Sequence, residues 1–266
     1  MDPVSVAATM RYGRAVAPVA LSAARHVAID ALENRITGPS RARSRRRFQT
    51  WCRAACRRLG VTVELRGGPA AGPCVLVANH RSYLDVVVLG SALGAAFLSR
   101  ADVRDWRVIG PAARAIGCIF IDRDDVRSRA RAVRGLAGVL DSTTVVVFPE
   151  GTTGGAPLPG PFADGVFRLL ARFDVPAIPV TLRYSDPRAY WIDSLSMAEH
   201  LRERVLAAPL AACVHVGAPL SIAPGREPRE LTAAVHRAVC APIEREGEFF
   251  VPERPRTSLT GGAMNR

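Results

Sequence analysis

Apolar residues recur three or four positions apart over the first 60 residues of the chain, a spacing that predicts helices. We expect one helix over residues 5–34, with a kink near Pro18, and an end at Gly38 and Pro39. Ser40 can then cap a second helix over Arg41–Leu59. The apolar positions of this second helix form a single stripe: Phe48, Trp51, Cys52, Ala55, Cys56 and Leu59.

After Gly60 the pattern changes to short apolar runs that alternate with helical stretches. The runs of strand length are Val61–Leu65, Val75–Ala78, Ala96–Ser99, Cys118–Ile121, Val145–Phe148, Ala177–Leu182 and Ala212–Val216. The helical stretches are Leu84–Leu93, Trp106–Ile116, Val126–Leu140, Asp164–Phe173, Met197–Leu206 and Pro228–Arg245. This alternation predicts an α/β fold with a largely parallel central sheet flanked by helices.

The change of pattern divides the chain into a basic helical segment (residues 1–59), an α/β domain (60–246) and a loose tail (247–266). A helix with Trp and Phe on one side and Arg on the other is typical of a membrane interface. The alternative is that the same apolar stripe packs on the domain and leaves a solvated basic face. The most apolar stretch, Ala15–Leu32, is interrupted by Pro18 and three polar residues, so we expect a peripheral or monotopic protein that does not span the membrane.

The net charge of +12 favours an anionic partner, and all 36 basic residues are Arg. Eight of them lie within 18 positions: Arg41, Arg43, Arg45, Arg46, Arg47, Arg53, Arg57 and Arg58. An anionic membrane surface or an acidic carrier fits this cluster. A nucleic acid is disfavoured because aromatic residues make up only 6% and none interleave a basic strand.

The six cysteines form no Cys-x-x-Cys pair and no His/Cys grouping, so we expect no metal and a reducing compartment. The start, Met1–Val6, carries no secretory signal pattern. Together with the basic helix, these features predict a location at the cytoplasmic face of the membrane.

His80 and Asp85 form the first candidate for catalysis. His80 follows the apolar run Val75–Ala78 and precedes a helix, and strand ends are where open α/β sheets bind ligands. Asp85, about one helical turn later, can accept a hydrogen bond from His80 Nδ1 and leave Nε2 as a free base. A helix-capping Asp beside an ordinary histidine is the alternative.

Two further segments include the ends of predicted strands. Phe148-Pro149-Glu150-Gly151-Thr152-Thr153 offers backbone N–H groups and hydroxyls that suit an anionic or polyhydroxyl ligand, or else it is a Gly-rich turn. Gly117–Arg123 ends in Asp122 and Arg123, which either bind a phosphate or form a surface ion pair.

Taken in chain order, these residues resemble the lysophosphatidic acid acyltransferase family of glycerolipid acyltransferases. The family pattern N-H-x-S-x-x-D reads NHRSYLD here, G-x-I-F-I-D-R reads GCIFIDR, F-P-E-G-T is present unchanged, and V-P-x-x-P-V reads VPAIPV at Val175–Val180. The resemblance runs from about Arg53 to Leu220 and implies the glycerolipid acyltransferase fold, with an N-terminal segment that associates with the membrane.

The resemblance implies an enzyme that moves a fatty acyl group from acyl-CoA or acyl-carrier protein onto the hydroxyl of a lysolipid. His80 would be the general base and Asp85 its orienting carboxylate. The substrate contacts it implies are Asn79, Ser82, Arg123, Glu150, Gly151 and Thr152, with Arg123 on an acceptor phosphate. We expect no cofactor besides the acyl donor. A thioesterase on the same scaffold and a non-catalytic lipid-binding protein remain alternatives.

Two positions depart from the pattern of members that use glycerol phosphates. Such members carry Arg after F-P-E-G-T, where this chain has Thr153, and often Lys at the position of Ala163. Both departures remove a cation that would hold a phosphate. A related branch, which acylates lyso-ornithine lipid, tolerates Thr at the first position, so the acceptor stays open between lysophosphatidic acid and a lyso-aminolipid.

Overall fold

The computed structural model describes residues 3–68, 72–105, 110, 113–114, 118–122, 125–140, 144–171, 173, 175–192, 195–220 and 227–252. Within these residues seven strands form one sheet in the order β1-β7-β6-β2-β5-β3-β4. The strands are β1 (Val61–Arg66), β2 (Val75–Ala78), β3 (Ala96–Arg100), β4 (Ile119–Ile121), β5 (Val145–Val147), β6 (Ala177–Tyr184) and β7 (Leu210–Val216). Only the β6–β7 pair is antiparallel among the described strands, which confirms the largely parallel sheet.

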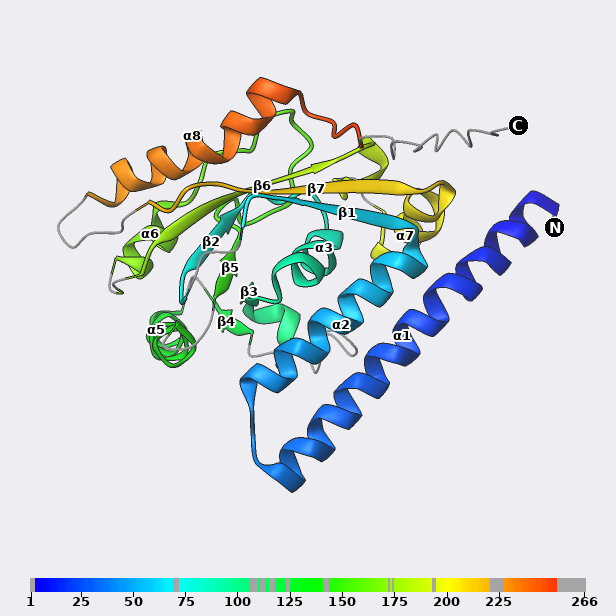
Figure 1. Cartoon of the computed structure of the whole chain (residues 1–266), viewed down its shortest axis with the longest axis horizontal. Coiled ribbons are helices and arrows are strands. Elements are labelled where there is room, and N and C mark those ends of the chain that lie inside the picture. Colours follow the sequence, from blue (N-terminus) through cyan, green and yellow to red (C-terminus); the bar gives the residue numbers. More distant parts are fainter. Residues whose placement is uncertain are drawn as a thin grey trace, which may run out of the picture.

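Helices cover both faces of this sheet (Figure 1). The α-helices are α1 (Pro3–Thr37), α2 (Arg41–Leu59), α3 (Leu84–Leu93), α5 (Val126–Leu140), α6 (Asp164–Leu170), α7 (Met197–Glu203) and α8 (Pro228–Glu246), and the 3₁₀ turns are η1 (Ala101–Asp105), η2 (Pro187–Ala189) and η3 (Val205–Ala207). Most of the helix expected over Trp106–Ile116 lies outside the described residues. The first helix continues without a break through Pro18.

Successive side chains of the central strands point to opposite faces and so supply two cores. Leu76 and Ala78 of β2 belong to the cluster that α2 and α3 complete. Val75 and Val77 belong to the cluster that α5, α6 and α8 complete on the other face. β2 is the central strand and is buried on both faces. Packing on both sides therefore fixes where its carboxyl end lies.

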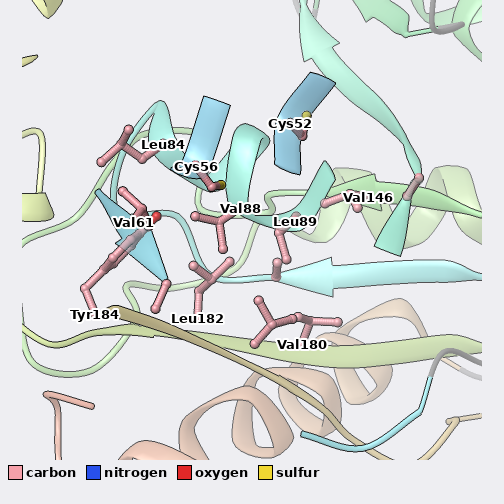
Figure 2. Close-up of a cluster of buried hydrophobic side chains, with 14 of the residues drawn as sticks. Cys52, Cys56, Val61, Leu84, Val88, Leu89, Val146, Val180, Leu182 and Tyr184 are labelled. Carbon is pink, nitrogen blue, oxygen red and sulfur yellow. The ribbon is translucent and has the colours of Figure 1, made fainter. Parts of the chain in front are cut away.

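The apolar stripe of α2 packs into the first core and does not face outward. Phe48, Cys52, Cys56 and Leu59 are buried with side chains of α3 and the sheet, and Figure 2 shows Cys52 and Cys56 above Val88 and Leu89 of α3. The prediction that this stripe contacts a membrane is therefore wrong, because α3 and the sheet cover it. Helix α2 is thus packed into the first core, and the division of the chain after residue 59 stays a prediction.

Helix α1 lies along the outer side of α2 and is joined to it by polar contacts (Figure 1). The buried Asp30 carboxylate accepts hydrogen bonds of 2.7 and 2.9 Å from Ser44 Oγ. Glu33 forms ion pairs with Arg43 and Arg47 of α2. With its acidic groups turned toward α2, α1 exposes apolar side chains on its other side, namely Leu21 (74%), Leu32 (59%) and Ile36 (72%).

In the part of the chain that the structure describes, no helix combines the length and the apolar character needed to cross a membrane.

The close contact of α2 with α3 depends on Gly90. A Cβ atom at Gly90 would lie 2.7 Å from Cys52 Sγ and 2.7 Å from Phe48 Cε1, both of which are buried. We expect Gly90→Ala to lower the free energy of unfolding by about 1–3 kcal/mol through overpacking, measured by urea denaturation. The matched control is Gly165→Ala in α6, where no atom lies within 4 Å and the change should be neutral or stabilising by up to about 1 kcal/mol. Equal midpoints for the two variants would contradict the packing described here.

Candidate active site

The site forms where three neighbouring strands end. β2 lies between β5 and β6 and runs parallel to both, so the carboxyl ends of the three strands meet at one edge of the sheet. His80 follows β2, Glu150 follows β5, and Tyr184 is the last residue of β6. The structure thus brings together the NHRSYLD and FPEGT segments. It adds a tyrosine, Tyr184, that the sequence pattern did not indicate.

His80 and Asp85 are hydrogen bonded as predicted. His80 Nδ1 lies 2.7 Å from Asp85 Oδ2. Because the carboxylate accepts, the proton lies on Nδ1, and the lone pair of Nε2 is left for a substrate. The side chain of His80 is 20% exposed while that of Asp85 has no exposure, so the pair has one open side. The imidazole also stacks on Phe148, with 4.1 Å between ring centroids, which limits its rotation.

Asp85 is a fully buried carboxylate in the first turn of α3. Besides His80, its Oδ2 accepts hydrogen bonds from the main-chain N–H groups of Arg81 (2.6 Å) and Ser82 (3.0 Å). Its Oδ1 accepts a 2.8 Å hydrogen bond from the hydroxyl of Tyr184. A buried charge is tolerated when it is hydrogen bonded in this way. The positive end of the α3 dipole, at its N-terminus, also stabilises the negative carboxylate.

The Tyr184 hydroxyl remains a donor to Asp85. Its burial, and then the adjacent Asp85 carboxylate, raise the pKa of Tyr184 well above its usual value. Sequence reasoning missed this residue, although its place at the end of the strand beside β2 is a signal that could have found it.

Glu150 is placed differently from the predicted contact to an acceptor. Its Oε1 accepts a 2.7 Å hydrogen bond from the main-chain N–H of His80, and its Oε2 accepts one of 2.9 Å from that of Gly160. Both oxygens brace the backbone, and the predicted contact of Glu150 with a substrate stays a prediction. Burial raises the pKa of Glu150, while these two hydrogen bonds and the nearby Arg81 charge oppose the rise.

Asn79 and Ser82 are fully buried, and their predicted contacts with a substrate stay predictions. The Asn79 amide donates to Leu182 O and accepts from Leu182 N, at 3.0 and 2.7 Å, and so joins the end of β2 to β6. Ser82 Oγ accepts from Leu84 N at the start of α3. Both residues support the backbone around His80 and Asp85.

Gly151 and Thr152 lie on the turn that follows β5. Gly151 has φ of +74°, a conformation that favours glycine, and its N–H donates to Phe148 O. Thr152 is exposed, so its hydroxyl remains available to a ligand. The predicted contacts of these two residues with a substrate stay predictions, and Arg123 lies outside the described residues.

Arg81 is a buried cation that the sequence did not single out. Its Nη1 donates to the carbonyls of Gly154 (3.1 Å) and Ala156 (2.6 Å), and its Nη2 to that of Pro157 (2.8 Å). Its guanidinium carbon lies 5.1 Å from the centre of the Tyr190 ring. Arg81 therefore holds the Gly-rich loop after β5. Its Nη1 and Nη2 groups are occupied by hydrogen bonds to carbonyls of that loop.

The loop is also attached to the segment after β6. Thr153 Oγ1 donates a 2.5 Å hydrogen bond to Trp191 O, and Trp191 N donates one of 2.9 Å to Arg81 O. Ile192 covers Gly155, where a Cβ would lie 2.6 Å from Ile192 Cδ1. The place after F-P-E-G-T is thus occupied by a short side chain that is bound to protein. Ala163 is half-buried and donates its N–H to Pro149 O.

Among the described residues, no three His, Cys, Asp or Glu side chains converge in a way that could hold a metal ion.

Comparisons with known proteins agree on one family. Residues 60–183 match the model of the Acyltransferase family. Lyso-ornithine lipid O-acyltransferase from Rhodobacter capsulatus is 30% identical over 225 residues, which cover 80% of this chain and 82% of that protein. The chloroplastic 1-acyl-sn-glycerol-3-phosphate acyltransferase BAT2 from Brassica napus is 38% identical over 113 residues, which cover 41% of this chain and 33% of that protein.

The fold is that of a solved structure, the 1-acyl-sn-glycerophosphate (LPA) acyltransferase PlsC from Thermotoga maritima. The two chains superpose with a TM-score of 0.62 at 18% sequence identity, over 87% of this chain and 98% of the other.

The hydroxyl of Tyr184 should stabilise the protein through Asp85. We expect Tyr184→Phe to lower the free energy of unfolding by about 1–3 kcal/mol, since Asp85 Oδ1 would be left buried without its donor. Urea denaturation of the single variant, of Asp85→Asn and of the double variant measures the coupling. The loss caused by Tyr184→Phe should shrink in the Asp85→Asn background, and an equal loss in both backgrounds would rule out the interaction as the cause.

Proposed function

The chain belongs to the lysophosphatidic acid acyltransferase family of glycerolipid acyltransferases, and we propose that it acylates the free hydroxyl of a lyso-aminolipid such as lyso-ornithine lipid, with His80 as general base. That it is a lysolipid acyltransferase follows from its family and relatives. The observation that carries the proposed mechanism is the His80–Asp85 pair, in which Nδ1 is held at 2.7 Å and the imidazole keeps one open side.

In the proposed reaction His80 Nε2 takes the proton of the acceptor hydroxyl as its oxygen attacks the thioester carbonyl of the acyl donor. Asp85 stabilises the imidazolium that forms, because its carboxylate is already fixed against Nδ1–H. The tetrahedral intermediate then releases the thiol of the donor, to which the imidazolium returns the proton. A new ester replaces the thioester, and no serine of the enzyme is needed.

The acceptor proposal rests on the charge around the loop after β5. Thr153 stands where members that use glycerol phosphates carry Arg, and its hydroxyl is bonded to Trp191 O. Arg81, which lies beside the loop, is 1% exposed and bonded to three carbonyls, so it does not offer its charge to a ligand. A lysolipid without a phosphate head group suits these surroundings better than lysophosphatidic acid. Gly151 and Thr152 are the residues we propose to contact the polar backbone of the acceptor.

The purified protein should acylate lyso-ornithine lipid faster than lysophosphatidic acid, with acyl-CoA or acyl-carrier protein as donor. His80→Ala should lower this transfer about 10²- to 10⁴-fold, since it removes the general base. The measurement is ester formation from labelled donor across a panel of lysolipids, with release of free fatty acid followed in parallel. The control is His215→Ala in β7, a histidine whose charged neighbours among the described residues include Glu246 and Arg183 and none of the site residues, which should keep wild-type turnover.

Three results would contradict the proposal. Fatty acid release without ester formation would identify a thioesterase. Preferred use of lysophosphatidic acid would overturn the acceptor assignment, and near wild-type turnover by His80→Ala would overturn the mechanism.

We also propose that the protein binds an anionic membrane surface from the cytoplasmic side, through α1 and the arginines of α2. Leu21, Leu32 and Ile36 are separated by 11 and 4 residues, so they lie on one face of α1, and all three are exposed. The exposed arginines of α2 include Arg46, Arg53 and Arg57. Exposed apolar area on one helix together with exposed cations on its neighbour favours a surface of anionic lipids.

Binding to vesicles tests this surface. Leu32→Glu with Ile36→Glu should reduce co-sedimentation with phosphatidylglycerol vesicles, and salt should weaken the wild-type binding. Val251→Glu is the matched control, because Val251 is an exposed apolar residue that follows α8 and lies away from α1. Equal binding by the α1 double variant and the control would exclude α1 as the contact.

A further inference from the structure

Glu150 connects the loop that carries His80 to a second segment of the chain, Pro159–Gly160, called here the Pro159–Gly160 turn. One of its oxygens accepts from the N–H of His80 and the other from the N–H of Gly160, at 2.7 and 2.9 Å. Because a carboxylate is planar and rigid, these two bonds fix the backbone of His80 relative to the Pro159–Gly160 turn. The position of this turn therefore affects the position of the imidazole.

His236 of α8 holds the same turn from the other side. Its Nε2 lies 3.2 Å from Pro159 O and 3.1 Å from Gly160 O. Carbonyl oxygens only accept hydrogen bonds, so Nε2 carries the proton and donates to this pair. The ring also meets Phe162 edge to face, with 4.8 Å between centroids, and lies 3.8 Å from Cys240 Sγ, one helical turn further on. These neighbours keep the imidazole of His236 directed at the turn.

Helix α8 is a firm support for this contact. Its apolar face, including Leu231, Val235 and Val239, is buried in the second core against the sheet. Thr181 Oγ1 of β6 donates a 2.7 Å hydrogen bond to Val239 O, which joins α8 directly to the sheet. A continuous series of hydrogen bonds thus runs from α8 through Gly160 and Glu150 to His80.

We propose that His236 is a positioning residue for acyl transfer, which acts through Gly160 and Glu150 to hold the His80 imidazole in its reactive orientation. The proposal rests on the proposed function, because it assumes that His80 is the general base. His236 touches neither substrate nor reacting atoms. Its effect should therefore appear in the rate of the chemical step and in the mobility of the His80 ring.

Two substitutions of His236 separate its donor from its volume. His236→Met keeps a similar volume but cannot donate, and we expect kcat to fall about tenfold with little change in KM, since a misplacement of about 1 Å can cost roughly 10²-fold in rate. His236→Gln keeps an N–H near the place of Nε2 and should restore most of kcat. Thr181→Val is the matched control, because it removes a buried hydrogen bond of α8 without touching the turn, and it should lower stability while kcat is unchanged.

The path through Glu150 is tested by a double-mutant cycle. In a Glu150→Ala background the hydrogen-bond path from Gly160 to the N–H of His80 is removed, so His236→Met should have a clearly smaller effect on kcat. Nitrogen NMR of the His80 imidazole gives a second readout that does not depend on activity. Its signals should shift or broaden in His236→Met and match the wild type in His236→Gln.

The proposal is overturned if His236→Met keeps wild-type kcat and wild-type His80 signals, or if its effect is undiminished in the Glu150→Ala background. It is also overturned if Thr181→Val lowers kcat as much as His236→Met does. Failure of the proposed function is a separate outcome: the wild type would then acylate no lysolipid. The His80 signals would in that case still report whether His236 positions this ring.

Discussion

The carboxylate of Asp85 has no exposure to solvent, and a buried charge is costly unless every lone pair finds a donor. Four donors meet it: the His80 ring, the main-chain N–H groups of Arg81 and Ser82, and the hydroxyl of Tyr184. They come from the loop after β2, the entry to α3 and the end of β6. These hydrogen bonds make the burial of Asp85 tolerable. The one from His80 Nδ1 also fixes the tautomer and the orientation of the imidazole.

The topology of the sheet makes this arrangement possible. β2 is the central strand between two parallel neighbours, so the residues that leave β5 and β6 flank the residues that leave β2. Glu150 bonds the main chain of His80 from one side, and Asn79 bonds the main chain of β6 on the other. His80, the proposed base, is thus supported by backbone contacts on both sides of its strand.

The His80–Asp85 site and the proposed membrane contact of α1 differ in how their side chains are buried. The His80–Asp85 pair is mostly buried and held by hydrogen bonds at Nδ1 and at both carboxylate oxygens, with one open side. Helix α1 is held to α2 by Asp30 and Glu33, while its apolar residues Leu32 and Ile36 remain exposed. The proposed contact with lipid rests on this arrangement of acidic groups turned inward and apolar groups turned outward.

The sequence by itself determined the strands, most of the helices, the largely parallel sheet and the His80–Asp85 pair, because periodicity and a spacing of five residues are local properties. Only the tertiary structure decided which neighbour covers the apolar stripe of α2, since a stripe predicts burial but does not name the surface that buries it. The partners of Glu150 and the contribution of Tyr184 were likewise decided there. These contacts join residues 70 and 99 positions apart, and their formation depends on strand order, which no local pattern records.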